Sequence, residues 1–171
     1  MTPSDVSRKT RALAVEWLQR RGVSREDVAQ LVLDLQRDFV PGLTLESCLE
    51  SVDAVLEKRE VANALLTGIA LDQLAERGLL PEPLQRMVFE DDRLYGIDEV
   101  MALSIVNVYG TIGLTNFGYL DKLKPGIVGV TDRGGHDGIR CNTYLDDLVS
   151  AVAAAAAARI AHRDRDLRGD L

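Results

Sequence analysis

The sequence predicts an all-α fold, a single-domain helical bundle of about six helices packed around buried central helices. Apolar residues recur at three- and four-residue spacing along most of the chain, and no alternating run is long enough for a convincing strand. Two segments, 100–120 and 148–158, carry no charge, which is typical of helices buried on every side. A chain of 171 residues can bury one substantial core, so residues 1–171 are expected to form one domain.

Three helices are expected in the first half of the chain, over residues 5–22, 24–35 and 44–78. Asp5, Ser24 and Thr44 can each accept hydrogen bonds from the free amides of a first turn, so each is placed at a helix start. Pro41-Gly42 separates the second helix from the third. The third pattern is long for one globular helix, and a kink is therefore expected near Lys58-Arg59.

Three more helices are expected over residues 81–90, 96–120 and 144–162. A straight helix from Asp98 to Asp121 would be roughly 35 Å long. We therefore expect the chain to turn back near Gly110–Gly113, because glycine weakens a helix by about 1 kcal/mol per position. The segments 97–118 and 144–161 are expected to be the most buried helices.

The remaining segments are expected to be irregular. Residues 125–142 are rich in glycine and polar side chains, which indicates a loop with one short extended piece at Ile127-Val128. The tail 163–171 is expected to fray, because it is charged and terminal.

The formal charge of −7 is spread unevenly along the chain. Residues 1–25 hold six Lys/Arg against two Asp/Glu, whereas residues 26–158 hold ten against twenty-two, a net charge of −12. Binding to a phosphate backbone needs a basic surface, so this distribution argues against nucleic acid as a partner. A segment so rich in carboxylates suits the binding of cations.

Cysteine content and hydropathy predict a cytoplasmic chain. Cys48 and Cys141 follow a polar N-terminus, and a disulfide between them is not expected. The uncharged segment 100–120 has the length of a membrane span, but nearly half of it is polar or glycine, and lipid would leave those groups unsatisfied. Membrane contact is therefore expected to be at most peripheral. The basic first helix could lie on an anionic surface, but packing of its apolar stripe against the core is the favoured use.

Two acidic pairs stand at the starts of the two uncharged helices, Asp98-Glu99 and Asp146-Asp147. Either pair alone would be expected to complement the positive end of the helix dipole. If the two helix starts are neighbours, however, three or four carboxylates converge, and their unpaired burial would cost several kcal/mol each without a cation. Oxygen ligands favour Mg²⁺, with Mn²⁺ as a substitute, over zinc. Asp98, Glu99, Asp146 and Asp147 are therefore the candidate metal ligands.

Asp121 and Lys124 lie between the two pairs and are the candidate catalytic residues. Lys124 would contact a phosphate, and Asp121 would serve as a base or a further metal ligand; the alternative is an ordinary helix end, where lysine favours the last carbonyls. His136 is a candidate acid or a loop histidine without a role. Glu60 is a weaker candidate ligand, because the charged neighbours Lys58 and Arg59 indicate a salt-bridged face.

Three short segments occur in a fixed order: Ile97-Asp98-Glu99, residues 117–127 (FGYLDKLKPGI) and Leu145-Asp146-Asp147. They resemble the motifs of the phosphatidylglycerophosphatase A family over roughly residues 94–155. Residues 60–72 (EVANALLTGIALD) are similar to its soluble, low-temperature-requirement C-like branch, which extends the resemblance over most of the chain. Gly118 stands where the membrane-bound members have an arginine.

The resemblance implies a Mg²⁺-dependent phosphatase that removes the phosphate from phosphatidylglycerophosphate in phospholipid biosynthesis. One or two Mg²⁺ would be held by the acidic pairs, with a phosphorylated small molecule or a lipid headgroup as substrate. Two alternatives stay open: a hydrolase of a water-soluble phosphate or nucleotide, and a non-catalytic helical oligomer in which cations or partner subunits neutralise the acids. In each case a homo-oligomer is expected.

Overall fold

The computed structural model describes residues 3–135 and 138–169, and in these ranges the chain is helical with no strand. The elements are α1 (Pro3–Arg20), α2 (Arg25–Gln36), α3 (Leu45–Leu56), α4 (Arg59–Glu76), α5 (Leu84–Phe89), α6 (Ile97–Val106), the 3₁₀ turn η1 (Asn107–Tyr109), α7 (Gly110–Leu123), α8 (Gly126–Gly134) and α9 (Leu145–Arg168). The all-α prediction is confirmed, but six helices was too few.

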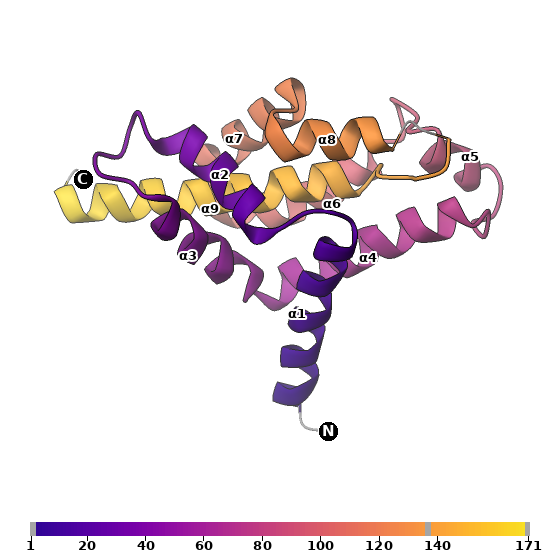
Figure 1. Ribbon diagram of the computed structural model, residues 1–171, viewed down its shortest axis with the longest axis horizontal. Coiled ribbons are helices and arrows are strands. Elements are labelled where there is room, and N and C mark those ends of the chain that lie inside the picture. The colour runs from indigo at the N-terminus through magenta and orange to yellow at the C-terminus, as the bar shows by residue number, and fades with distance from the viewer. Residues whose placement is uncertain (1–2, 136–137, 170–171) are drawn as a thin grey trace.

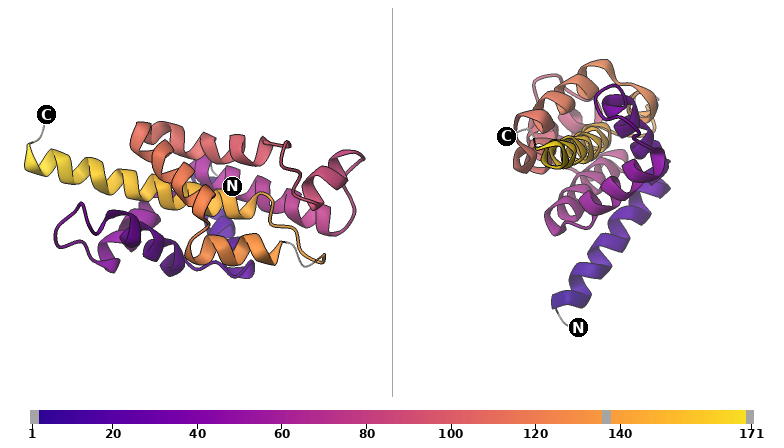
Figure 2. Two further views of the ribbon diagram at one scale, coloured as in Figure 1. Left: turned by 90° about the horizontal axis from the view of Figure 1, so that it is seen from above. Right: turned by 90° about the vertical axis from the view of Figure 1, so that its left-hand side faces the viewer.

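Helix α9 forms the centre of the molecule. In the end-on view of Figure 2 it is surrounded by the other helices, and it packs against α2, α3, α4, α6, α7 and α8. Every residue from Cys141 to Ala158 is buried, which confirms the prediction for this segment. The run of alanines has no long side chain, so the surrounding helices can approach the α9 backbone closely. Helix α1 stands out from this body at its N-terminal end (Figure 1).

The predicted turn in the uncharged segment is also confirmed. Helix α6 ends at Val106, η1 follows, and α7 begins at Gly110, whose φ of 66° lies in the left-handed region that favours glycine. The two helices form a hairpin that packs against α9. The run Ile97–Leu123 has the length and mean hydropathy of a membrane span, which is weak evidence for one, and here its two ends return to the same pocket.

The expectation that residues 97–118 are among the most buried was wrong. Only 33% of the apolar window in this hairpin is buried. Each helix buries one stripe of residues three positions apart: Ala102 and Ile105 on α6, and Phe117 and Leu120 on α7. The opposite face is open to solvent, with its large apolar side chains exposed: Ile97, Val100, Val108, Leu114 and Tyr119. A lack of charge therefore marked an apolar surface here rather than burial on every side.

Three boundaries differ from the sequence prediction. The kink expected near Lys58-Arg59 is a full break between α3 and α4, which accounts for one additional helix. Residues 126–134 form α8 rather than a loop with an extended piece, because Val128 and Thr131 bury one side of a short helix that starts after Pro125. Helix α9 continues through Arg168, so the tail predicted to fray from residue 163 is helical over most of its length.

Candidate active site

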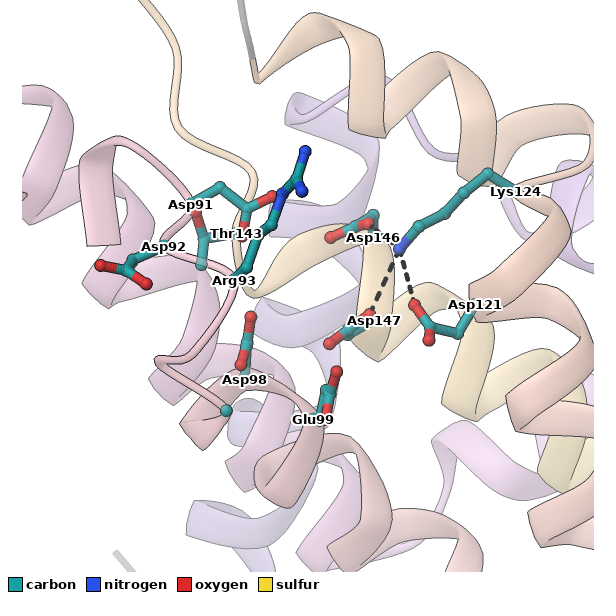
Figure 3. Close-up of a pocket in the computed structure, with 11 residues that line it drawn as sticks. Asp91, Asp92, Arg93, Asp98, Glu99, Asp121, Lys124, Thr143, Asp146 and Asp147 are labelled. Atoms are coloured by element: carbon teal, nitrogen blue, oxygen red, sulfur yellow. Dashed lines mark hydrogen bonds and ion pairs between the residues drawn. The ribbon is translucent and has the colours of Figure 1, made fainter. Parts of the chain in front are cut away.

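Three helix ends and one loop meet at a cavity of about 210 Å³ (Figure 3). They are the starts of α6 and α9, the end of α7, and the loop between α5 and α6. The lining residues are Asp91, Asp92, Arg93, Gly96, Asp98, Glu99, Asp121, Lys124, Thr143, Asp146 and Asp147. All six predicted site residues are thus brought together, although they are up to 49 positions apart in the sequence.

The local backbone explains how these side chains reach one place. Gly96, with a φ of 66°, precedes α6 and lets the chain enter the helix directly before Asp98. At the other end of the hairpin, Lys124 itself adopts the left-handed conformation (φ 46°, ψ 51°), and its amide donates to the carbonyl of Leu120 at 2.8 Å. This C-terminal cap stops α7, and Pro125 then starts α8. The cap therefore places Asp121 and Lys124 at the pocket.

The ammonium of Lys124 lies among three carboxylates. It donates to Asp121 Oδ1 at 2.8 Å and to Asp146 Oδ2 at 2.6 Å, and it is 3.6 Å from Asp147 Oδ1. Burial opposes the charged form of this lysine, but the three carboxylates, Asp146 foremost, outweigh it and raise the pKa of Lys124 above its ordinary value. The lysine is therefore cationic at any physiological pH.

The carboxylates at the bottom of the pocket are deeply buried. Asp98, Asp146 and Asp147 are 8%, 6% and 3% exposed. Burial raises the pKa of each of the three, and the charge of Asp146 raises that of Asp147 further. Asp98 Oδ1 is buried with no hydrogen-bond donor among the described residues. An unsatisfied buried carboxylate oxygen is costly, so this oxygen points to a cation as its missing partner.

The donor set fits a hard divalent cation. Seven carboxylates and two cations line the pocket, a formal charge of −5. Carboxylate oxygens are the ligands that Mg²⁺ and Mn²⁺ prefer. Within the described ranges, no three acidic, histidine or cysteine side chains are yet placed to hold one ion. The Lys124 ammonium lies among three of these carboxylates. Its side chain would therefore have to move away from them when an ion binds.

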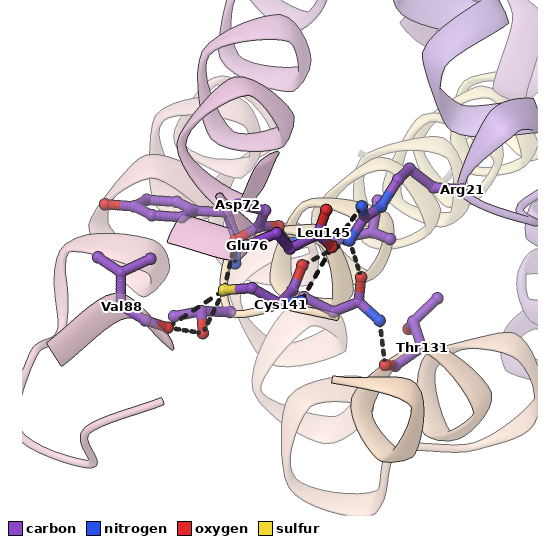
Figure 4. A network of polar contacts seen from close by, with 10 residues as sticks. Arg21, Asp72, Glu76, Val88, Thr131, Cys141 and Leu145 are labelled. Atoms are coloured by element: carbon purple, nitrogen blue, oxygen red, sulfur yellow. Dashed lines mark hydrogen bonds and ion pairs between the residues drawn. The ribbon is translucent and has the colours of Figure 1, made fainter. Parts of the chain in front are cut away.

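Helix α4 fixes the start of α9 through a buried aspartate (Figure 4). Asp72 is fully buried, and its two oxygens accept hydrogen bonds from the amides of Tyr144 (3.1 Å) and Leu145 (3.0 Å). Tyr144, the residue before α9, has no side-chain cap of its own. Burial raises the pKa of Asp72 to about 8, although the amide of Tyr144 and the charge of Arg21 oppose this shift. Asp72 thus takes the place of an N-cap for the helix that carries Asp146.

The segment before α9 is held by a wider network. Arg21 pairs with Glu76 at 2.7 Å and donates to the carbonyl of Cys141 and to Asn142 Oδ1. Asn142 Nδ2 in turn donates to the carbonyl of Thr131 at 2.7 Å (Figure 4). Arg21, directly after α1, and residues on α4 and α8 are thereby tied to the chain just ahead of the two site aspartates. The start of α9 is thus held by hydrogen bonds from three parts of the fold.

The sequence prediction did not include Asp91, Asp92, Arg93 or Thr143 as pocket residues. The first three form a charged run in the loop before α6, but nothing local indicates that this loop reaches the start of α9. Asp72 was also missed, although a signal existed, because it continues the buried stripe of α4 at helical spacing and places a charge in the core.

Three other residues singled out in the sequence lie apart from the pocket lining. Glu60 lies in the first turn of α4 and is not among the lining residues. Gly118 is exposed on α7 with no atom within 4 Å of a Cβ placed there, and it does not line the pocket. His136 is outside the described residues.

The sequence model of the phosphatidylglycerophosphatase A family matches residues 15–162. The chain belongs to this family. It is 58% identical over 155 residues to the uncharacterized protein YpjQ of Bacillus subtilis, covering 91% of this chain and 86% of that protein. It is 49% identical over 166 residues to the uncharacterized protein YutG of the same organism, covering 96% and 98%.

The fold is shared with a solved structure of the same branch. The low temperature requirement C protein from Listeria monocytogenes is 55% identical and superposes with a TM-score of 0.87, over 90% of this chain and 96% of that one. The resemblance to the family and to its low-temperature-requirement C-like branch is confirmed. In this chain, the three motifs lie at the three helix ends that form the pocket.

Proposed function

We propose that this chain is a Mg²⁺-dependent phosphatase that hydrolyses a phosphomonoester. The observation that carries the proposal is the convergence of five carboxylates and one lysine from three helix ends on one cavity: Asp98, Glu99, Asp121, Asp146, Asp147 and Lys124. The family description makes phosphatidylglycerophosphate the first substrate to test. The negative formal charge of the pocket would repel such a substrate, so a cation is needed before any phosphate can enter.

The two acidic pairs are the proposed ligands. Asp98 and Glu99 at the start of α6 and Asp146 and Asp147 at the start of α9 would hold one or two Mg²⁺, with Mn²⁺ as a substitute. Bound Mg²⁺ supplies charge stabilisation of the phosphoryl oxygens and lowers the pKa of water. The unpartnered Oδ1 of Asp98 supports this assignment.

Lys124 is the proposed phosphate contact. Its ammonium neutralises Asp146 and Asp147, which are also the proposed ligands of the ion. The ion and the ammonium therefore compete for the same oxygens, and ion binding would free Lys124 to donate to a phosphoryl oxygen. Negative charge is spread over the phosphoryl oxygens in the transition state, and a cationic donor placed there offsets it.

Asp121 is the proposed base. Its carboxylate bonds Lys124 but is less buried than the floor of the pocket, with a side chain 32% exposed. A partly exposed carboxylate beside the phosphate contact can accept the proton of the attacking water.

The test is phosphate release from a panel of substrates. The panel contains phosphatidylglycerophosphate in mixed micelles, a water-soluble phosphomonoester and a nucleotide, each with Mg²⁺, with Mn²⁺ and with EDTA. We expect release only with a divalent ion. Release that persists in EDTA would refute the metal-dependent mechanism. Hydrolysis of the soluble compounds alone would identify a free phosphate, rather than a lipid, as the substrate.

Metal binding is tested separately by calorimetry. Asp147→Asn keeps the shape of a ligand and removes its charge, so Mg²⁺ affinity should fall roughly tenfold or more. The matched control is Asp38→Asn, which removes the same charge from an exposed residue after α2 that does not line the pocket. Equal Mg²⁺ affinity in the two variants would remove Asp147 from the site. A chain that binds Mg²⁺ and hydrolyses nothing in the panel would instead be the non-catalytic oligomer.

A further inference from the structure

Among the residues that the structure describes, the pocket is lined by two cationic side chains, of which one is paired with carboxylates and the other is not. Lys124 is bound to three carboxylates. Arg93, in contrast, makes no hydrogen bond or ion pair with any residue in the described ranges, although it lines the same cavity. An arginine that lines a pocket of seven carboxylates without pairing with one of them has its guanidinium available for another anion.

The backbone around Arg93 is held in place. The amide of Leu94 donates to Asp92 Oδ1 at 3.0 Å, and the amide of Tyr95 donates to the carbonyl of Asp92 at 2.8 Å. The hydroxyl of Tyr95 bonds that of Tyr144, the residue before α9. This turn therefore fixes Arg93 relative to the helix that carries the site aspartates.

Arg93 is more exposed than three of the four proposed metal ligands, Asp98, Asp146 and Asp147. Asp146 and Asp147 form the buried floor, whereas Arg93 is an exposed side chain at the rim. Figure 3 shows Arg93 and Lys124 on opposite sides of Asp146 and Asp147. A group that binds Arg93 therefore lies nearer to solvent than a phosphoryl group bound at the floor and at Lys124.

We propose that Arg93 binds a second anionic group of the substrate while the phosphomonoester occupies the floor of the pocket. The preferred substrate class is then a phosphomonoester that also carries a phosphodiester or a second phosphate. A guanidinium suits this role, because it presents paired N–H donors to phosphate oxygens and stays charged. The identity of the reacting group rests on the proposed function; the second subsite does not. A lipid headgroup and a free bisphosphate share this chemistry.

The binding test uses phosphonates, which cannot be hydrolysed. Affinities of the full chain for propylphosphonate and for propane-1,3-bisphosphonate are measured by calorimetry with Mg²⁺ present. We expect the wild type to prefer the bisphosphonate by roughly tenfold or more, the range of a charge-assisted hydrogen bond, and Arg93→Ala to abolish that preference. Arg86→Ala is the matched control, since Arg86 is an exposed arginine on α5 that does not line the pocket.

The source of the second group is resolved with vesicles. Phosphatidylcholine vesicles carrying phosphatidic acid, which has the monoester alone, are compared with vesicles carrying phosphatidylglycerophosphate, which has a monoester and a diester. Preferential binding of the latter, lost in Arg93→Ala, identifies a lipid headgroup. Preference only among the soluble phosphonates identifies a free bisphosphate. Either result supports the subsite.

Two results would overturn the proposal: a wild type that does not distinguish the two phosphonates, and equal preferences in Arg93→Ala and Arg86→Ala. The proposed function can fail independently. If the chain prefers the bisphosphonate through Arg93 but releases no phosphate, the second subsite is supported and the proposed phosphatase activity is refuted.

Discussion

Gly68 lies where α4 crosses the start of α9, and replacing it by alanine tests how closely the two helices are packed. The new Cβ would be 2.4 Å from Leu148 Cδ1 and 2.9 Å from Tyr144 Cβ. Leu148 can move the end of its side chain, but Tyr144 Cβ is fixed by the backbone that Asp72 holds. Because carbon atoms need about 3.5–4.0 Å, the helices would have to separate by roughly 0.6–1.1 Å at Tyr144.

Two effects oppose each other in this variant. Alanine favours a helix over glycine by about 1 kcal/mol, whereas overpacking costs about 1–3 kcal/mol. The control is Gly118→Ala, on α7, where the added Cβ meets no atom within 4 Å and only the propensity gain applies. In urea unfolding, Gly68→Ala should therefore be about 1–3 kcal/mol less stable than Gly118→Ala. If Gly68→Ala gains as much stability as the control, the close approach of α4 and α9 is not as described.

Three further predictions concern buried groups. Because burial raises the pKa of Asp72 from 3.8 to about 8, the folded chain holds a proton there that the unfolded chain releases. The free energy of unfolding should thus fall between about pH 5 and 8, with Asp72 contributing at most ~1.4 kcal/mol per pH unit. In Asp72→Asn this fall should be less steep. If urea unfolding gives the same pH dependence for the wild type and the variant, the prediction is wrong. Burial raises the pKa of Cys48 to about 11 and of Cys141 to about 12, so neither thiol should react with Ellman's reagent before the chain unfolds. Ala155→Leu overfills a fully buried position on α9 and should cost about 1–3 kcal/mol in thermal unfolding, whereas an unchanged midpoint would mean a looser core.

Helix starts were predictable because their signals are local. Ser24 and Thr44 cap α2 and α3 as expected, accepting from the amides of Asp27 (3.1 Å) and Ser47 (3.2 Å). The prediction for Asp5 was wrong, because α1 begins at Pro3 and Asp5 lies inside its first turn. The break at Gly110 was predictable for a different reason: the site hypothesis required both ends of the hairpin at one place. The alanine run of α9 indicated close packing, and the helix is central.

The errors came from tertiary contacts that the sequence does not display. Helix α8 has three glycines, which predict a loop, yet burial of Val128 against the body stabilises it as a helix. The apolar composition of α6 and α7 could not reveal that one face would remain open. Of the pocket, the sequence indicated the residues at helix ends, whereas Arg93 arrives on a loop whose path depends on the Tyr95–Tyr144 contact.

Because α9 is the centre of the fold and follows in sequence the helices that pack on it, the order of synthesis matters. A protein is made from its N-terminus, and early segments usually begin to fold before the chain is complete. Here α2, α3, α4, α6, α7 and α8 all pack on a helix that starts only at residue 145. The earlier helices therefore leave the ribosome with apolar faces that have no partner yet. A chain released before the alanine run lacks the helix on which these six helices pack.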